Sequence, residues 1–280
     1  MDFNNTEVFN IENAIRGMRN PLESWAKSDT GWYDDTEENQ EKCEYKDFDF
    51  DFDNYKFKAI GPNDLNLARR LIAGGAPHCK FLRQIFVTVD ITAPLYWWKE
   101  FDTYKIGTTA NSTSTMHKLA STPITKDCFE MDDYEGHLLM YEREPYDLDA
   151  FTDDMWDSII NYCETLRRSY LETKDIKYWK ELIRILPESW LQTRTVTMNY
   201  EVLRNICYWR KGHKLTEWKT FLDWAECLPY AEDFIFQSST EQELKEDAEK
   251  FRSMMKEINA LGPDGALWED IDRIVEKYID

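Results

Sequence analysis

The chain has 280 residues, of which 42% are hydrophobic and 15% aromatic, with 11 tryptophans. A chain of this length and composition forms one large domain or two small ones, so disorder of the whole chain is excluded. Its formal net charge of −20 disfavours DNA or RNA as a partner, because an acidic surface repels the phosphate backbone. A small anionic ligand remains possible, because a pocket sets its own local potential.

Two features of the sequence bear on where the protein works. No apolar run approaches the length of a membrane span, and the N-terminus lacks the basic and apolar regions of a secretion signal. The six cysteines are scattered, without the Cys-x-x-Cys or Cys/His spacing of a zinc site. We therefore expect a cytoplasmic protein with reduced thiols and no metal site.

The first sixty residues combine an ordered beginning with an acidic segment. Residues 7–27 predict a helix, or a strand followed by a helix, that ends near Asn20-Pro21. Residues 28–53 are polar, and positions 34–53 hold 10 acidic residues against 2 lysines. We interpret 28–53 as a solvated insertion, pinned to the body by phenylalanines of its Asp-Phe repeat. These are Phe48, Phe50 and Phe52.

Three later segments alternate with the period of two that is typical of strands. Residues 55–60 predict a short strand, and Asn63 or Asp64 is expected to cap a helix that runs to Ile72. The other two segments, 81–91 and 193–198, are rich in β-branched residues and are expected to share an antiparallel sheet. One face of the first of them carries four aliphatic side chains, Ile85, Val87, Val89 and Ile91.

Helices are predicted for most of the remaining chain. Apolar residues recur at helical spacing over 153–172, and 178–186, 200–210 and 216–227 have similar patterns. Thr240 and Glu243 form a capping-box signature for a helix to about Leu261, and a last helix is expected over 266–278. The sequence therefore predicts an α+β protein, with mixed helices, an antiparallel sheet and a C-terminal helical extension.

Two polar groups of residues are candidates for ligand contacts. The segment Thr108–Thr115 consists mostly of hydroxyl residues and is followed by His117 and Lys118, which suits a phosphate group. An ordinary Ser/Thr-rich loop has the same composition. Arg184 lies on an otherwise apolar turn, so a buried guanidinium with an anionic partner is expected, either a ligand or an acidic side chain. Asn199 and Asn205 are ligand contacts or simply cap and surface residues.

The order of the motifs from about residue 64 to 236 resembles the flavin-dependent thymidylate synthase (ThyX) family. A helix ends near His78, a strand leads into Ala93-Pro94, and Ile183-Arg184 precedes Leu186-Pro187, where the family has Ala-Arg-x-x-Leu-Pro. A strand then ends at Asn199. The family's Leu-x-Asn-Phe-x-x-x-Arg helix follows as Leu203-Arg204-Asn205-Ile206 to Arg210.

This resemblance implies roles for individual residues. Arg210 is the implied catalytic residue, because a fixed cation beside the uracil edge stabilises the charge that develops there. Substrate contacts are implied for Glu100, Thr113, Ser114, Thr115, Arg184 and Arg210. Flavin contacts are implied for His78, Lys80, Thr103, Lys105, Asn111, Asn199 and Asn205. The implied division of the chain is an N-terminal segment (1–63), the ThyX-like domain (64–236) and the helical extension (237–280).

The chain departs from the family at two cationic motifs. Thr103-Tyr104-Lys105 stands where the family has Arg-His-Arg, and Thr113-Ser114-Thr115 stands where it has Ser-x-Arg. Each lost charge-assisted contact costs about 1.5–3 kcal/mol. The departures therefore put the binding of FAD and of the substrate phosphate in doubt.

Three functions are consistent with this pattern. The first is reductive methylation of dUMP to dTMP with FAD, NADPH and methylenetetrahydrofolate, in a homotetramer with sites between subunits, as the resemblance implies. The second is a nucleotide-binding or regulatory protein of the same fold without flavin chemistry. The third is an enzyme for a modified pyrimidine nucleotide. The choice stays open, because a fold does not determine a reaction.

Overall fold

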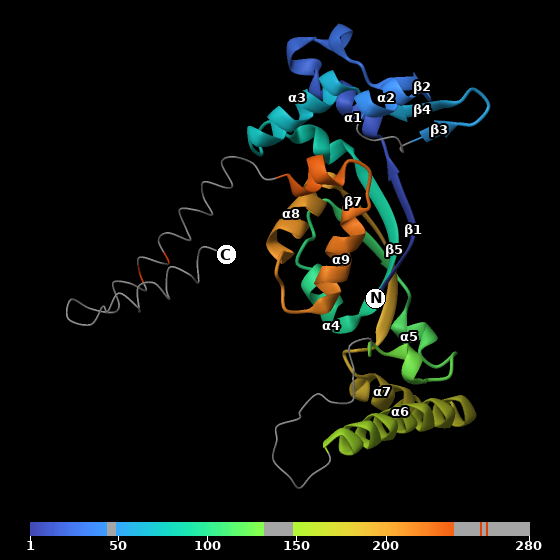
Figure 1. The fold of residues 1–280 in the computed structure, drawn as a ribbon. Coiled ribbons are helices and arrows are strands. Elements are labelled where there is room, and N and C mark those ends of the chain that lie inside the picture. The colour runs from blue at the N-terminus through green and yellow to red at the C-terminus, as the bar shows by residue number, and fades with distance from the viewer. Residues whose placement is uncertain (44–48, 132–147, 238–252, 254–255, 257–280) are drawn as a thin grey trace, which may run out of the picture. The chain divides into compact units, whose positions relative to one another are not determined.

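The computed structural model describes all residues except 44–48, 132–147, 238–252, 254–255 and 257–280 (Figure 1). Phe48 and nearly all of the expected C-terminal helices lie outside the described residues. The chain forms two compact units. The first unit contains Met1–Phe9 and Ile85–Leu228, and the second contains Asn10–Gln84 and Pro229–Asp280.

The first unit is built on a four-stranded sheet with the order β1-β5-β7-β6. Its strands are β1 (Asp2–Phe9), β5 (Phe86–Pro94), β7 (Leu191–Asn199) and β6 (Thr108–Ser112), and every neighbouring pair is antiparallel. The predicted pairing of the two β-branched segments is confirmed, since β5 and β7 run side by side from Phe86 opposite Asn199 to Pro94 opposite Leu191. The four aliphatic residues of the predicted face are fully buried, as expected.

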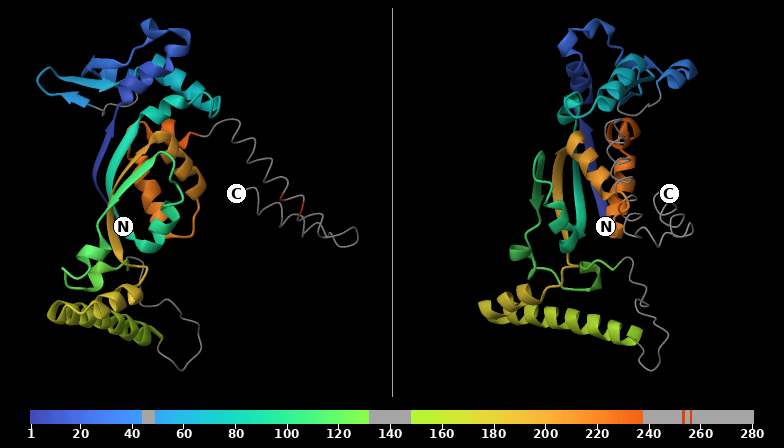
Figure 2. Two further views of the ribbon diagram at one scale, coloured as in Figure 1. Left: turned by 180° about the vertical axis from the view of Figure 1, so that it is seen from behind. Right: turned by 90° about the vertical axis from the view of Figure 1, so that its left-hand side faces the viewer.

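Three helices lie over one face of this sheet, as Figures 1 and 2 show: α4 (Leu95–Phe101), α8 (Tyr200–Arg210) and α9 (Thr216–Glu226). Their inward faces carry large aromatic side chains. The Trp97 ring lies 4.9 Å from the Trp98 ring and 4.8 Å from the Trp218 ring, measured between centroids. Because aromatic side chains bury large areas, this cluster fixes α4 and α9 against each other.

The hydroxyl-rich segment is not the loop that its composition suggested. Residues Thr108–Ser112 form β6, which pairs with β7 at the edge of the sheet, and the short helix α5 (Thr115–Lys118) follows. Threonine is β-branched and favours extended backbone, so an available edge of β7 is enough to make this segment a strand. The expectation of a phosphate-binding loop over Thr108–Ser112 is therefore wrong as to conformation.

Helices α6 (Leu148–Thr173) and α7 (Ile176–Ile185) pack together over a small core that they share with buried residues between Leu119 and Phe129. Glu164 of α6 joins this pair to the preceding loop, because it accepts the backbone N–H of Ile124 at 2.9 Å and pairs with Arg167 at 2.7 Å. Hydrogen bonds from Arg167, opposed by burial, lower the pKa of Glu164 to about 2. Short helix η4 (Lys126–Cys128) lies in the same region. Among the described residues, no helix combines the length and the apolar character needed to cross a bilayer.

The second unit contains helices α1 (Ile11–Met18) and α3 (Pro62–Ala73), with short helices between and after them. The N-terminal prediction of a strand followed by a helix is confirmed by β1 and α1. Three of the short helices are 3₁₀ helices: η1 (Asn20–Leu22), η2 (Trp25–Lys27) and η3 (Lys80–Gln84). The segment η5 (Glu232–Phe236) is a short π-helix.

The acidic segment is more ordered than expected. It contributes β2 (Gly31–Asp34), α2 (Glu37–Lys42) and β3 (Asp49–Asp51), and β4 (Lys56–Ala59) lies between the two strands in a sheet of order β2-β4-β3. Lysines of β4 face acidic residues across the sheet, for example Lys56 and Asp34 at 3.3 Å. Phe50 packs against the buried core of this sheet, but Phe52 is 80% exposed. Most described residues of this segment are exposed, as a solvated segment requires, and of its phenylalanines Phe50 packs inward as expected whereas Phe52 does not.

Asp64 does not cap helix α3 but lies inside the unit. The cap role falls to Asp29, whose carboxylate accepts the backbone N–H groups of Asn63 at 2.9 Å and Asp64 at 3.0 Å. Asp64 is fully buried and pairs with Arg19 at 2.5 Å. Its other oxygen accepts four hydrogen bonds from the preceding loop, two from side chains and two from backbone N–H groups. These donors belong to Ser28, Asp29 and Thr30.

Burial opposes the charge of Asp64, but the hydrogen bonds from Ser28 and Thr30 and the guanidinium of Arg19 outweigh it. They hold the pKa of this carboxyl below its ordinary value. The carboxylate therefore contributes stability above the ordinary pKa of an aspartate, about 3.9, and this contribution is lost as the pH falls through the lowered pKa.

Replacing Asp64 with alanine is expected to lower the free energy of unfolding by about 3–5 kcal/mol, because it leaves the Arg19 charge buried without its partner. Urea denaturation followed by circular dichroism measures the change. The matched control is Asp34→Ala, which removes a carboxylate from an exposed ion pair and is expected to cost less than about 1 kcal/mol. Similar losses in the two variants would contradict the role given to Asp64.

Candidate functional site

Arg210, the last residue of α8, is held on three sides in the first unit. Its Nη1 donates to Glu100 of α4 at 2.8 Å, and its Nε donates to the hydroxyl of Tyr104 at 3.0 Å. The guanidinium carbon lies 4.4 Å from the centroid of the Trp218 ring. The side chain is only 16% exposed. Such a guanidinium is fixed in position, since neither its stacking nor its hydrogen bonds allow other rotamers.

Glu100 is the common acceptor of this cluster. Its Oε2 accepts from Arg210 and from the indole N–H of Trp218 at 2.9 Å, and the Nε2 of His213 lies 3.5 Å away. Its Oε1 has no hydrogen-bond partner among the residues that the structure describes, and the side chain is partly exposed. The cluster therefore offers one carboxylate oxygen as an acceptor beside a guanidinium donor.

A second arginine, which the sequence analysis did not single out, has a parallel arrangement. Arg194 of β7 donates from Nη1 to Asp102 at 2.8 Å and from Nε to Gln192 at 2.9 Å, and it lies 4.2 Å above the Trp98 ring. It is 15% exposed. Alternation along β7 places Arg194 on the same face as the buried residues Val196 and Met198. A charge on the buried face of a strand was the signal that could have identified it.

Gln192 joins Arg194 to the hydroxyl segment. Its amide nitrogen donates to the carbonyl of Thr113 at 2.9 Å and to the hydroxyl of Thr115 at 3.3 Å, while its own backbone carbonyl accepts from Trp98. Thr113 is exposed, and Ser114 and Thr115 are half-buried. Two of the residues implied for the substrate, Thr113 and Thr115, are thus linked to a guanidinium through Gln192, although not to the guanidinium that was expected.

One helix end holds both arginines. Glu100 lies in the last turn of α4 and Asp102 is its C-cap, so the two carboxylates are two positions apart. Each fixes a guanidinium from a different element, Arg210 from α8 and Arg194 from β7. We name this group of four charged residues, with Tyr104, Trp98 and Trp218, the α4 cluster.

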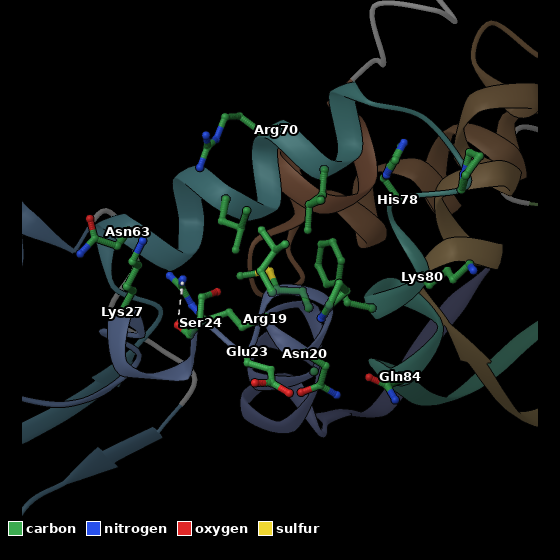
Figure 3. Close-up of a pocket in the computed structure, with 18 of the residues that line it drawn as sticks. Arg19, Asn20, Glu23, Ser24, Lys27, Asn63, Arg70, His78, Lys80 and Gln84 are labelled. Carbon is green, nitrogen blue, oxygen red and sulfur yellow. Dashed lines mark hydrogen bonds between the residues drawn. The ribbon is translucent and has the colours of Figure 1, made fainter.

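Two residues implied for the flavin lie in the second unit instead, where they line a cavity of about 1250 Å³ (Figure 3). His78 and Lys80 are both exposed side chains on its wall, and Arg70 of α3 lies on it as well. The close-up shows Asn20, Glu23 and Ser24 on another part of the wall, and it shows the Arg70 side chain on the side of α3 that faces away from the other labelled residues. Each unit therefore has its own concentration of polar groups.

The chain was compared with known proteins. No family profile and no curated protein sequence matches it. Among solved structures, flavin-dependent thymidylate synthase ThyX from Helicobacter pylori complexed with FAD and dUMP is similar. The TM-score is 0.54 at 16% identity, over 84% of this chain and 98% of that one. A second structure of Helicobacter pylori ThyX with FAD and dUMP gives a TM-score of 0.53 at 16% identity, over 85% and 98%.

This chain has the ThyX fold. The predicted fold class, α+β with mixed helices and an antiparallel sheet, is confirmed by the architecture and by these neighbours. An identity of 16% establishes the fold and not the reaction. The site residues that the resemblance to ThyX implies must therefore be judged from where the structure places them.

Arg184 departs most from the ThyX expectation. It is 61% exposed and pairs with Glu181 at 3.0 Å, one turn earlier on α7. The expectation of a buried guanidinium is wrong, because Leu182 is the buried residue of this helix and Arg184 lies about 200° further around the helix axis. The spacing agrees with this placement. Counted back from Leu186-Pro187, the arginine of Ala-Arg-x-x-Leu-Pro falls on Ile183.

The remaining residues implied for the flavin of ThyX do not form a set in the first unit. Thr103, Lys105 and Asn111 are exposed. Asn199 is buried and caps α8, since its Oδ1 accepts the backbone N–H of Val202 at 3.0 Å. Asn205 is exposed and accepts from the indole of Trp209 at 3.1 Å. The cap and surface interpretation of the two asparagines thus agrees with their contacts, and a flavin role for these residues stays a prediction.

Gly107 allows the segment after α4 to approach Asn199. Its φ is +77°, and a Cβ built there would lie 2.8 Å from Cγ2 of Val202 and 3.0 Å from Nδ2 of Asn199. Only glycine tolerates both the left-handed backbone and this contact. The position where the family has Arg-His-Arg is therefore tied closely to the start of α8.

Replacing Glu100 with alanine is expected to lower the free energy of unfolding by about 1.5–3 kcal/mol, since the partly buried Arg210 then lacks its charged acceptor. Chemical denaturation provides the measurement. The control is Glu188→Ala. It removes the exposed partner of Lys99, which lies on α4 as Glu100 does, and it is expected to cost less than about 1 kcal/mol. A loss no larger than that of the control would show that Glu100 does not fix Arg210.

Proposed function

We propose that this chain binds a pyrimidine nucleotide at the α4 cluster. The observation that carries the proposal is the pair of immobilised guanidinium groups, each stacked on a tryptophan ring and each paired with a carboxylate from one helix end. Both Arg194 and Arg210 use Nε and Nη1 for these contacts, and Nη2 of each has no partner among the described residues. Each arginine thus keeps a donor for a ligand.

The cluster offers groups that match the two ends of a pyrimidine nucleotide. A uracil edge presents carbonyl oxygens beside an N–H group. Arg210 can donate to a carbonyl oxygen, and the Oε1 of Glu100 can accept the N–H. Arg194, Gln192 and the hydroxyl of Thr115 form a linked polar group suited to a phosphate. Lys118 is exposed at the end of α5 and adds a cation to the same segment.

The solved structures with the ThyX fold indicate which nucleotide to test first. The two similar structures contain dUMP together with FAD. We therefore take dUMP as the reference nucleotide for this chain. Both arginines are already paired with carboxylates, so the cluster favours a nucleotide over a bare anion. The ligand must offer a donor to Glu100 as well as an acceptor to Arg210. A modified pyrimidine with the same edge fits the same groups.

The nucleotide proposal predicts that Arg194→Ala and Arg210→Ala each weaken dUMP binding about 10- to 100-fold, the equivalent of about 1.4–2.8 kcal/mol. Isothermal titration calorimetry of the folded variants measures the dissociation constants. Arg184→Ala serves as the matched control, since Arg184 is exposed and paired only within α7, and its binding is expected to equal that of the parent. Equal affinity in all three variants would place the nucleotide elsewhere.

A second candidate is the flavin-dependent methylation of dUMP, which the fold and the FAD in both similar structures favour. It requires FAD, NADPH and methylenetetrahydrofolate, and the resemblance implies a homotetramer with sites between subunits. The residues implied for the flavin fit poorly: Asn199 is engaged as a cap, and Thr103 stands in place of a cation. We derive no step through the flavin for this reason.

The visible spectrum of the purified protein separates the two candidates. Flavin chemistry predicts absorbance from about one FAD for each chain, together with dTMP formation that Arg210→Ala abolishes without unfolding the protein. Nucleotide binding without flavin chemistry predicts a colourless protein that takes up no added FAD yet retains dUMP. A colourless protein without FAD uptake would remove the methylation candidate and leave the nucleotide proposal standing.

A further inference from the structure

Gln192 of β7 is buried and uses every donor of its side-chain amide. Its Oε1 accepts from Nε of Arg194 at 2.9 Å. Its Nε2 donates to the carbonyl of Thr113 at 2.9 Å and to the hydroxyl of Thr115 at 3.3 Å. A glutamine amide has one acceptor oxygen and two N–H groups, so no donor of this side chain remains for a ligand.

The orientation of this amide follows from the chemistry of its partners. The guanidinium of Arg194 only donates hydrogen bonds, and the carbonyl of Thr113 only accepts them. A reversed amide would place its NH₂ group against the guanidinium and its oxygen against a carbonyl, so both contacts would become repulsive. The amide of Gln192 therefore connects Arg194 to the segment 113–115 in one orientation only.

The sheet and helix α4 bring these groups together. Gln192 and Arg194 are two positions apart on β7, so their side chains lie on the same face of the strand. The backbone N–H of Thr113 donates to the carbonyl of Thr193 at 2.9 Å, which keeps the chain beside β7 after β6 ends. From α4, the indole N–H of Trp98 donates to the backbone carbonyl of Gln192 at 2.9 Å. Both neighbours of the glutamine side chain are thus fixed by backbone contacts.

The hydrogen bond from Arg194 to Gln192 decides which N–H groups of the guanidinium stay available. A carboxylate commonly takes two parallel N–H groups of an arginine. Asp102 accepts from Nη1 of Arg194 at 2.8 Å and is about half exposed, so it has room to turn toward a second N–H group. Gln192 holds Nε, and the Trp98 ring lies against the guanidinium face. Together they keep the guanidinium plane in the orientation that leaves Nη2 without a partner among the described residues.

We propose that Gln192 is a positioning residue that makes the site select a nucleotide over the corresponding nucleoside. It acts through Arg194, whose Nη2 it keeps available for the phosphate, and through the segment 113–115, which it holds beside that arginine. This inference rests on the nucleotide site proposed at the α4 cluster. The hydrogen bonds that fix Arg210 and Glu100 do not involve Gln192, so its loss affects the phosphate end and not the base end.

Calorimetric titration of the full chain with dUMP and with deoxyuridine tests this selectivity. Gln192→Met keeps the length of the side chain and removes its three hydrogen bonds. It is expected to weaken dUMP binding about tenfold and to leave deoxyuridine binding unchanged. The matched control is Thr193→Val, which removes the hydrogen bond to Thr92 on the opposite face of the sheet and is expected to change neither affinity. Equal weakening of both ligands in Gln192→Met would contradict a role at the phosphate.

A double-mutant cycle shows whether Gln192 acts through Arg194. If it does, the double variant Gln192→Met, Arg194→Ala binds dUMP as Arg194→Ala does, because no guanidinium is left to position. Additive losses in the double variant would overturn the positioning role. Circular dichroism verifies that the variants fold, and Gln192→Leu replaces Gln192→Met in the cycle if the methionine variant does not.

The nucleotide site and the role of Gln192 fail in different ways. Unchanged dUMP binding in Arg194→Ala would overturn the phosphate end of the site. Weaker binding in Arg194→Ala but not in Gln192→Met would overturn the role of Gln192 alone. Nuclear magnetic resonance tests the positioning without any nucleotide, since the Nε–H proton of Arg194 is expected to exchange with water at least about tenfold faster in Gln192→Met than in the parent. An unchanged exchange rate would overturn the positioning role whatever the titrations show.

Discussion

The continuous antiparallel pairing of β5 with β7 is the constraint on which the site of the first unit depends. Helix α4 follows β5 directly and α8 follows β7 directly, so the two helices start from opposite ends of the sheet. Both turn back over the same face, and their C-terminal residues meet. A helix C-terminus carries partial negative charge, which favours a cation such as Arg210 at that position. The pairing register therefore brings Glu100 and Arg210 together although 110 positions separate them.

The two units differ in whether their positively charged side chains are paired with carboxylates. In the α4 cluster, each guanidinium is neutralised by a carboxylate and flattened against an indole ring. In the cavity, the side chains of Lys27, Arg70 and Lys80 are exposed and have no ion-pair partner among the described residues, whereas Arg19 is paired with Asp64. The first arrangement selects a ligand by shape and by its pattern of donors and acceptors.

Sequence patterns predicted the elements whose partners are local or whose period is strong. The face of β5 and the helices α6, α8 and α9 fall in this group, because alternation or helical spacing follows directly from one buried face. The strands of the acidic segment were not predicted, since its charges are compensated across a sheet by the lysines of β4, and no local pattern reveals that pairing. Segment Thr108–Ser112 was misjudged because hydroxyl residues occur in both loops and edge strands.

The candidate site was predicted in part for the same reason. Arg210 and Glu100 were identified from a motif, but the contacts that fix them come from Tyr104 and Trp218 on other segments. Arg194 was missed because its partner Asp102 lies 92 positions away. Arg184 was overvalued because apolar neighbours in sequence do not imply burial in space. A helix turns each successive side chain by about 100°, so one turn contains both a buried and an exposed direction.

Strand β1 has a consequence for dividing this protein into pieces. The chain leaves the first unit after Phe9 and returns to it at Ile85, so the sheet is completed by a segment that precedes the second unit. A fragment that begins at Ile85 lacks β1 and exposes the backbone N–H and C=O groups of β5 along one side. Unpaired strand edges recruit strands from other molecules. Self-association of such a truncated fragment is thus built into the chain order, whereas the same sheet in the intact chain has β5 covered on both sides.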